Sequence, residues 1–216
     1  MKKLLTVFLL GLCTLSYGQN DSFIFVFLNK KPDGEKLSQE QEDKLMEGHL
    51  ANINKMASEG KLLAAGPFDG GGGIFIFKST STKEVKGWIQ DDPAVKANRW
   101  NIEVLPFRVR AGSVCAVSEP YEMVTYNFIR YVPAFSKFTV SDAPVTFKSH
   151  DDYLKKIEHS GNVIAEGIFG ENDGGILIMK GDLQKEVIEF DPGVQQGLLE
   201  LEFKNLWIAK GSFCEK

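Results

Sequence analysis

The sequence predicts an α+β fold made of two similar units, each with the element order β-α-β-β-α-β. Three observations support this prediction. Motifs of the first half recur in the second at a separation of 101 and later 99 residues, both halves show the same order of strand and helix patterns, and the strands are apolar on both faces. A single period of this length indicates a duplicated domain rather than a solenoid. The recurring residues are His49 and His150, Gly60 and Gly161, Gly66 and Gly167, Phe68 and Phe169, Asp92 and Asp191, and Cys115 and Cys214.

The first unit is expected to span residues 19–115. Ser38 followed by Gln41 is a capping-box sequence, which predicts that a long helix begins at this point. The glycine run at 70–73 predicts a turn between two strands and precedes no helix, so it is not a phosphate-binding loop. In chain order, we expect a strand at 22–28, a helix at 38–60, strands at 61–68 and 74–78, a helix at 82–90 and a strand at 100–109.

The second unit is expected at 124–216, after a linker at 116–123 that has no apolar period. Pro133 and Pro144 occupy the stretch where the first unit starts its long helix, so the corresponding helix should be shorter at its N-terminal end. His150 would then lie at the start of that helix. In chain order, we expect a strand at 124–131, a helix near 151–160, strands at 162–169 and 174–180, a helix at 183–190 and a strand at 199–209.

The element order of each unit is that of a ferredoxin-like fold, in which two helices cover one face of the sheet and leave the other face open. Runs such as residues 23–28 are apolar throughout. The open face therefore needs a cover, and the second unit is the nearest one. We expect the two units to pack sheet to sheet as an intrachain dimeric α/β barrel. The chain would then be a monomer with the form of a pseudo-dimer, and higher oligomers stay open.

Residues 1–18 have the pattern of a signal peptide, because two lysines precede an apolar stretch and Ser16 and Gly18 supply small residues at a cleavage site. This pattern predicts export to the periplasm or the exterior. A lipoprotein anchored through Cys13 is the alternative, and Leu12 is a poor residue to precede a lipidated cysteine.

Without the two lysines of this segment, the formal net charge changes from −4 to −6. A mildly acidic balance argues against nucleic acid as a partner, since nucleic acid requires a basic surface. No segment after residue 18 is apolar enough to span a membrane. We expect the partner to be a small-molecule ligand.

Cys115 and Cys214 are the cysteines that follow the signal segment, and they stand at corresponding places in the two units. In an oxidising compartment, such a pair can form a disulfide. The alternative is two free thiols at the ends of two matching strands, related by the repeat and not by contact. The sequence leaves both alternatives open.

Several short motifs of the first unit stand in a characteristic order and spacing. They are GHLANI at 48–53, EGKL at 59–62, AGPF at 65–68, GIFIF at 73–77 and DPAV at 92–95. In these motifs, over nearly its whole length, the first unit resembles the YCII-related (YciI-like) family. The second unit resembles the family more faintly, through His150, Gly167, residues 174–176 and the Asp191-Pro192 pair.

The resemblance implies a dimeric α/β barrel whose active centre is a histidine–aspartate pair. Carried over by motif, the pair is His49 with Asp92, and its counterpart in the second unit is His150 with Asp191. Relatives are linked to small, often aromatic or lactone-like substrates, including dehydrohalogenation-type lyase chemistry. We expect the substrate to be bound beside Gly66 and Pro67 in the first unit and beside Gly167 in the second, where Ile168 replaces the proline.

Histidine takes up and returns a proton near neutral pH, and a carboxylate bound to one ring nitrogen fixes the tautomer. The predicted function is therefore that of a cofactor-free acid–base enzyme of the lyase or isomerase type. One histidine and one aspartate per unit are too few ligands for a closed metal site, so we expect no metal. The alternative is a purely structural role for each residue. Each histidine would be a hydrogen-bonded polar residue within a helix, and each aspartate would form a turn before its proline. The alternative function is a non-catalytic small-molecule-binding or structural envelope protein.

Overall fold

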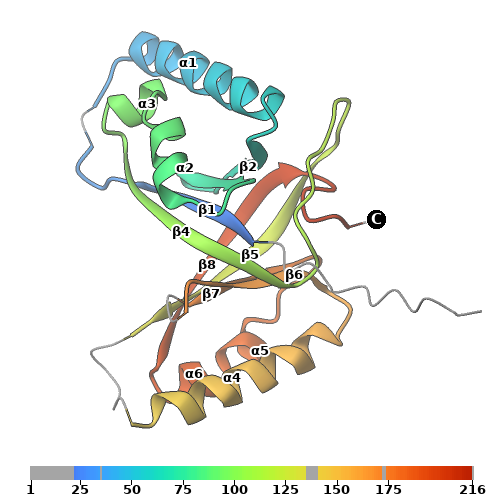
Figure 1. The fold of residues 1–216 in the computed structure, drawn as a ribbon. Coiled ribbons are helices and arrows are strands. Elements are labelled where there is room, and N and C mark those ends of the chain that lie inside the picture. Colours follow the sequence, from blue (N-terminus) through green and yellow to red (C-terminus); the bar gives the residue numbers. More distant parts are fainter. Residues whose placement is uncertain (1–21, 35, 135–140, 172–173, 216) are drawn as a thin grey trace, which may run out of the picture.

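A computed structural model describes residues 22–34, 36–134, 141–171 and 174–215. The predicted signal peptide at 1–18 lies outside these residues. The two halves have the same order of elements, β-α-β-β-α-α-β, and the α+β class is confirmed (Figure 1). The first half consists of β1 (Ser22–Lys30), α1 (Gln39–Ser58), β2 (Leu62–Pro67), β3 (Gly73–Phe77), α2 (Thr82–Ile89), α3 (Pro93–Lys96) and β4 (Trp100–Ala111). The second consists of β5 (Met123–Pro133), α4 (Ala143–Glu158), β6 (Val163–Phe169), β7 (Gly175–Met179), α5 (Lys185–Glu189), α6 (Pro192–Gln195) and β8 (Leu199–Ala209).

The eight strands form one antiparallel sheet in the order β2-β3-β1-β4-β6-β7-β5-β8. The sheets of the two halves, which we expected to pack face to face, are joined into one, because β4 of the first half pairs with β6 of the second. The two outer strands also meet. Phe68 forms a bridge with Leu206, and the amide of Asp69 donates to the carbonyl of Asn205 at 3.1 Å. These contacts close the sheet into a barrel, so its two outer strands meet within the described residues.

The inner face of the barrel is filled by aromatic and branched side chains, among which Phe25, Phe128 and Phe169 are fully buried. The ring of Phe25 lies 5.3 Å from that of Phe169 and 6.3 Å from that of Phe128, so residues of both halves share this core. Burial of each such ring stabilises the fold by about 1.5–3 kcal/mol. The outer face carries α1, α2 and α3 on one side and α4, α5 and α6 on the opposite side (Figure 1).

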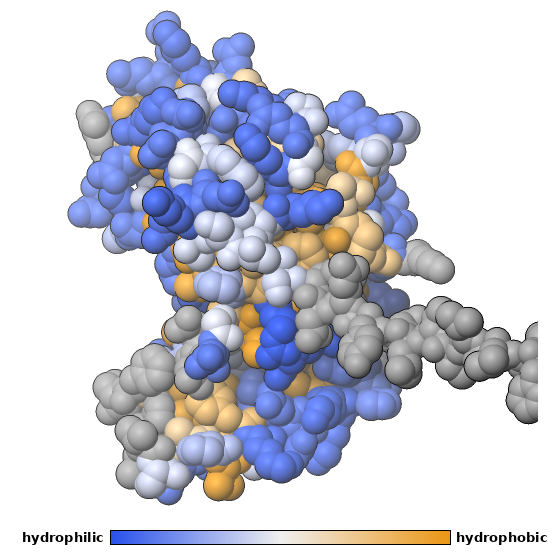
Figure 2. Space-filling model, viewed as in Figure 1, coloured by the Kyte–Doolittle hydropathy of each residue, from blue (hydrophilic) through white to orange (hydrophobic). Residues whose placement is uncertain are grey.

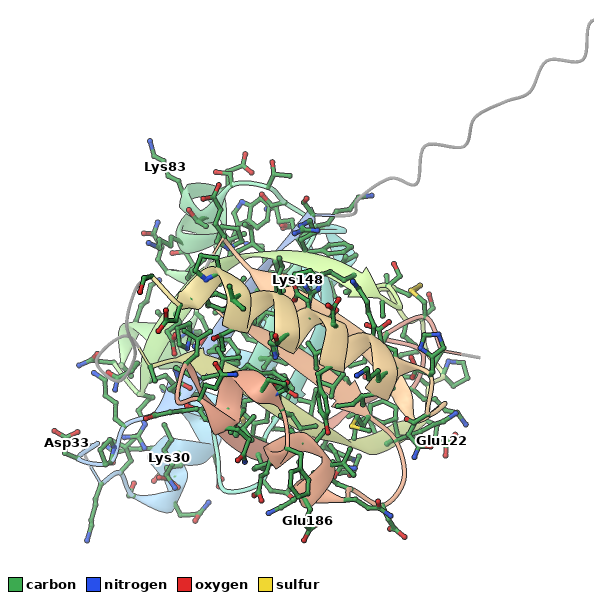
Figure 3. The ribbon with its side chains drawn as sticks, turned by 90° about the horizontal axis from the view of Figure 1, so that it is seen from below. Lys30, Asp33, Lys83, Glu122, Lys148 and Glu186 are labelled. Carbon is green, nitrogen blue, oxygen red and sulfur yellow. A yellow bond between two sulfur atoms is a disulfide. The ribbon has the colours of Figure 1, made fainter. Side chains whose placement is uncertain are left out.

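Much of the surface over the upper helices is hydrophilic, and hydrophobic residues in view lie beside the barrel strands and over part of the lower helices (Figure 2). Seen from the side of the second half, α4 with Lys148 and α5 with Glu186 lie across the sheet (Figure 3). Within the described ranges no helix is long and apolar enough to cross a membrane.

The start of α1 follows the sequence prediction. The Ser38 hydroxyl accepts the Gln41 amide at 3.3 Å, and the Gln41 side chain accepts the Ser38 amide at 2.9 Å. This reciprocal pair satisfies two backbone donors that the first helical turn leaves free. The helix therefore begins at Gln39 and runs far enough to carry His49 across the sheet.

The start of α4 corrects the prediction. The helix begins at Ala143 and not near Asp151, so His150 lies in its middle. Pro144 stands in the first turn, where its missing N–H has no intrahelical partner to lose and its fixed φ suits the helix. The helix has 16 residues against 20 in α1, so the shorter helix that we expected is present, although it starts well before residue 151. The two histidines therefore occupy similar positions within their helices.

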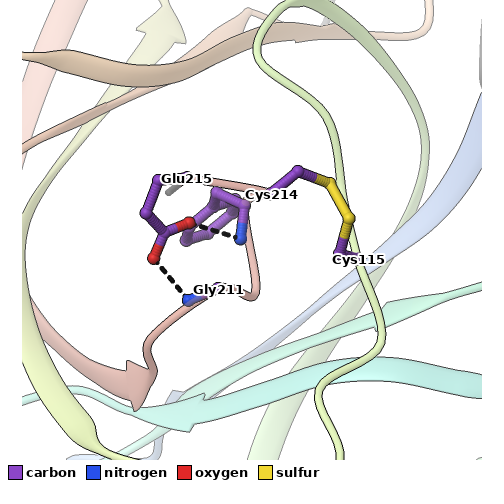
Figure 4. The surroundings of a disulfide bond; sticks show 5 residues. Cys115, Gly211, Cys214 and Glu215 are labelled. Carbon is purple, nitrogen blue, oxygen red and sulfur yellow. Dashed lines mark hydrogen bonds between the residues drawn. A yellow bond between two sulfur atoms is a disulfide. The ribbon is translucent and has the colours of Figure 1, made fainter.

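A disulfide joins Cys115, after β4, to Cys214, after β8 (Figure 4). The two Cα atoms lie 5.2 Å apart, within the usual range for such a bond. The Glu215 carboxylate holds the adjacent turn by accepting the amides of Gly211 at 2.6 Å and Phe213 at 3.0 Å. The structure thus decides between the two alternatives that the sequence left open, and it ties the ends of the two halves together.

Candidate active site

His49 on α1 and Asp92 before α3 are in direct contact. The Nδ1 atom of His49 lies 2.8 Å from the Oδ2 atom of Asp92. The histidine is 7% exposed, and the aspartate is fully buried. Sequence analysis predicted this contact between residues that are 43 positions apart, and it is present in the structure.

The local sequence explains why Asp92 stands where it does. Asp92 is the N-cap of α3 and Pro93 its first residue, an arrangement that favours a helix start. The second carboxylate oxygen, Oδ1, accepts the backbone amides of Ala94 at 2.9 Å and Val95 at 3.3 Å. The carboxylate is therefore both a structural cap and the partner of His49. Because the cap fixes its orientation, Oδ2 is held toward the histidine ring.

Asn52 is a third member of this cluster that sequence analysis missed. Its Nδ2 atom donates to Oδ2 of Asp92 at 3.1 Å. Asn52 follows His49 by three positions on α1, a spacing that places two side chains on one helix face. That spacing was the available signal.

The Asp92 carboxylate stays ionised in the folded protein. Burial alone would raise the pKa of Asp92, but hydrogen bonds and charge from His49, together with Asn52, lower this pKa below its usual value. An ionised carboxylate only accepts hydrogen bonds, so Nδ1 of a neutral His49 must carry the proton. The other ring nitrogen, Nε2, has no hydrogen-bond partner among the described residues and is free to exchange a proton.

Aromatic rings surround His49. The ring of Phe75 on β3 lies nearly parallel to it with a centroid distance of 5.8 Å, and the ring of Trp100 on β4 lies 5.0 Å away. Gly48 lets α1 approach α3, because a Cβ atom there would lie 2.8 Å from Cγ of Pro93. The first histidine thus sits against an apolar, aromatic wall.

The second half repeats the pair. Nδ1 of His150 lies 2.7 Å from Oδ2 of Asp191, and Oδ1 of Asp191 accepts the amide of Gly193 at 2.7 Å as the cap of α6. The ring of Tyr131 on β5 packs edge-on against His150 at 4.8 Å. At the position of Asn52 stands Tyr153, which donates instead to the carbonyl of Val187 at 2.8 Å. The pairing is the same in both halves, and its surroundings differ.

Comparison with known proteins identifies the first half. The family model of the YCII-related domain matches residues 23–108, the range that holds β1 to β4 and the His49–Asp92 pair. Residues 23–108 are thus similar to the YCII-related domain. The match agrees with the family resemblance that the motifs of this half predict.

Two solved structures have a similar course of the chain at low identity. One, a "putative monooxygenase" from Lactobacillus acidophilus, has 14% identity and a TM-score of 0.44, and the match covers 87% of this chain and 93% of that one. The other, a "putative monooxygenase" from Fusobacterium nucleatum, has 10% identity and a TM-score of 0.45, with 88% and 92% covered. No curated protein matches the chain.

The residues expected to line the two substrate sites lie as follows. Gly66 on β2 faces β8, where an added Cβ atom would lie 2.5 Å from the carbonyl oxygen of Trp207. Gly167 on β6 faces Phe107 of β4, with its ring 2.5 Å from such a Cβ. Pro67 ends β2 and is exposed. Both glycines thus allow strands to approach closely, and their predicted role in substrate binding stays a prediction.

Gly66→Ala should lower the free energy of unfolding by about 1–3 kcal/mol, because the new methyl group meets the backbone carbonyl of Trp207. Gly87→Ala is a matched control. Gly87 lies in α2 with nothing within 4 Å of the added Cβ, so that alanine should stabilise the protein by about 0.5–1 kcal/mol. Urea unfolding of both variants measures the two shifts. Equal shifts in the same direction would contradict the close approach of β2 and β8.

Because the pKa of Asp92 is lowered, we expect the free energy of unfolding to decrease at acidic pH. Because the pKa of Asp92 is lower in the folded than in the unfolded state, its contribution is complete above the unfolded value of about 3.9 and is lost as the pH falls below it. Urea midpoints at pH 5, 4 and 3 should therefore fall more steeply for the wild type than for Asp92→Asn, which does not titrate. Parallel curves would contradict the assignment.

Within the described part of the chain, no group of three or more histidine, cysteine, aspartate or glutamate side chains could hold a metal ion.

Proposed function

We propose that this protein is an exported acid–base enzyme of the lyase or isomerase type that acts on a small organic substrate without a cofactor. The observation that carries the proposal is the buried histidine–aspartate pair, found in both halves with the same atoms in contact at 2.8 and 2.7 Å. In each pair a helix cap holds the other carboxylate oxygen. A structural cap alone does not require a histidine on the second oxygen.

The proposed mechanism follows from the orientation of the rings. Asp92 accepts the Nδ1 proton and leaves the lone pair of Nε2 to take a proton from the substrate. The imidazolium that forms is stabilised by the ionised carboxylate. Its proton can then return to another substrate atom, as in an isomerisation, or follow a leaving group. His150 and Asp191 would act in the same way.

We further propose that the two halves are tandem copies of one ferredoxin-like unit, so that a single chain replaces a homodimer. The shared element order supports this, as does the Asp-Pro cap before α3 and α6. The copies would comprise residues 19–115 and 124–216, joined by a linker at 116–123. The disulfide between Cys115 and Cys214 supports export, since such bonds persist in oxidising compartments.

One observation favours the alternative, a non-catalytic binding or structural protein. Gly66 and Gly167 pack against neighbouring strands, and both histidines are only 7% exposed. A protein that had kept the fold and lost the chemistry would be expected to close its sites in this way.

Deuterium incorporation into a substrate distinguishes an acid–base enzyme from a non-catalytic protein. The mature protein is incubated in D₂O with a library of small carbonyl compounds, lactones and halogenated acids, and mass spectrometry measures exchange of carbon-bound protons. We expect exchange, or elimination, of at least one compound class by the wild type and its loss in His49→Asn together with His150→Asn. His159→Asn is the matched control, because His159 is exposed on the surface. Exchange that none of the three substitutions changes would contradict the proposal.

A further inference from the structure

The second half holds buried polar groups around its histidine that the first half lacks. Tyr131 on β5 and Glu166 on β6 are each 1% exposed. Glu166 accepts Nε and Nη2 of Arg110 at 2.6–3.1 Å, while Nη1 of Arg110 donates to Asp151, the neighbour of His150, at 2.6 Å. Arg110 belongs to β4, so the first half supplies a cation to the site of the second.

Strand register identifies the corresponding positions in the first half. Tyr131 pairs with Gly175 as Leu28 pairs with Gly73, and Glu166 pairs with Leu177 as Ala65 pairs with Phe75. The position of Arg110 corresponds, by the offset of 99 that relates the cysteines, to Ala209. Three polar side chains of the second site thus replace three apolar ones. The first site has Leu28, Ala65 and Ala209 where the second has Tyr131, Glu166 and Arg110.

The ion pair of Arg110 and Glu166 has a structural role, because it joins β4 and β6 across the two halves. The hydroxyl group of Tyr131 has no such role within the described residues. Its hydroxyl is buried and has no hydrogen-bond partner among the described residues. Leaving such a group unpaired costs about 1–3 kcal/mol, so buried hydroxyls in folded proteins are nearly always bonded. Phenylalanine would fill the same space without that cost, which indicates that the hydroxyl is kept for a partner outside the chain.

The charges nearby restrict what that partner can be. Burial, together with the carboxylates of Asp191 and Glu166, raises the pKa of Tyr131 well above its usual value, so the hydroxyl remains a donor. Among the described residues, the carboxylates of Asp191, Glu166 and Asp151 lie here, and Arg110 is the cation that pairs with two of them. An anionic ligand would add a further buried negative charge without a free cation to pair with. The ligand oxygen is therefore a neutral acceptor.

We propose that the His150 site binds a neutral carbonyl compound, such as a ketone, lactone or amide, whose oxygen accepts a hydrogen bond from the Tyr131 hydroxyl. The inference rests on the proposed function in taking the histidine–aspartate pairs as ligand sites. In that setting Tyr131 donates to the carbonyl oxygen while Nε2 of His150 is available for a proton on the adjacent carbon. Loss of that proton would leave an enolate whose negative oxygen the Tyr131 hydroxyl stabilises, and return of a proton to the same carbon would restore the carbonyl compound and complete one cycle of hydrogen exchange.

Two hydroxyl deletions test the first part of the proposal in the free protein. Tyr131→Phe removes a hydroxyl without an internal partner and should leave the melting temperature unchanged or raise it. Tyr153→Phe is the matched control, since it removes a hydroxyl that donates to the carbonyl of Val187 at 2.8 Å and should lower the melting temperature. A fall for Tyr131→Phe as large as that for Tyr153→Phe would overturn the proposal, because it would show that the Tyr131 hydroxyl already has a partner in the fold.

Ligand binding tests the second part. The probes are cyclopentanone, a neutral acceptor, and cyclopentanecarboxylate, an anion of similar shape. The histidines of the protein are labelled with ¹³C, and each probe is titrated into the protein while NMR follows the histidine ring signals. The signals of His49 and His159 serve as internal references. Cyclopentanone should shift the His150 signals in a saturable way, and Tyr131→Phe should weaken its binding about 3–10-fold, while Tyr153→Phe should not.

The outcomes of these experiments test the ligand proposal and the enzymatic function separately. Unchanged affinity in Tyr131→Phe, equal or tighter binding of the carboxylate, shifts at His49 in place of His150, or no response of the wild type would each overturn the inference. Binding at His150 in a protein that shows no histidine-dependent deuterium exchange would support the inference and refute the enzymatic function. The two proposals can therefore fail separately.

Discussion

Replacement of both Cys115 and Cys214 by serine is expected to lower the free energy of unfolding by about 4–5 kcal/mol. The disulfide closes a loop with a sequence separation of 99 residues. In the chain-entropy model, a bond that closes a loop of this length removes that much entropy from the unfolded chain, and any strain in the folded protein reduces the gain. Guanidinium unfolding of the mature protein and of the double serine variant, both without reductant, measures the difference.

The wild type under reductant is the control for the two substitutions. Its unfolding midpoint should move to that of the double serine variant, whereas reductant should leave the variant unchanged. Titration of the unfolded, unreduced wild type should find no free thiol at Cys115 or Cys214. Two reactive thiols, or equal midpoints for all samples, would contradict the bond.

The substitution Asp92→Ala is expected to destabilise the protein by about 3–5 kcal/mol. It removes the cap of α3 and leaves His49 and Asn52 without the carboxylate that they share. Breaking a buried polar pair by deletion of one partner has a cost of this size. Asp92→Asn should lose less, because asparagine is also a good N-cap. The midpoint of urea unfolding reports both losses.

The neighbouring residue provides the control. Asp91 is an exposed acid that forms an ion pair with Lys96 at 3.2 Å on the surface. Asp91→Ala should change the free energy of unfolding by less than about 0.5 kcal/mol. If Asp92→Ala proved as mild as Asp91→Ala, the tight His49–Asp92 cluster described above would be wrong.

Much of the fold could be predicted because local signals and tertiary packing agree. The capping box at Ser38 fixes the start of α1, and β8 has the bounds, Leu199–Ala209, that the apolar pattern indicates. The start of α4 was missed because a proline was taken to break a helix that it begins. The pairing of β4 with β6 could not be predicted from local sequence patterns, because pairing between distant strands depends on how the two halves pack together.

Part of the candidate site could likewise be predicted from the sequence, and part could not. The two histidine–aspartate pairs could be predicted because a repeat and a family motif mark the same residues. Asn52 and Tyr131 were missed, since neither is part of a repeated motif and their roles depend on what lies across the sheet. Arg110 could not have been assigned to the second site without the pairing of β4 with β6.

The central claim is that each buried aspartate orients a histidine as an acid–base group. The protonation of the ring nitrogens tests it most directly, and ¹⁵N NMR of histidine-labelled mature protein measures that protonation. At a pH where the rings are neutral, His49 and His150 should each carry the proton on Nδ1 and leave Nε2 bare, because the carboxylates of Asp92 and Asp191 accept from Nδ1. A proton on Nε2 in both rings, or the tautomer mixture of an exposed histidine, would contradict the account.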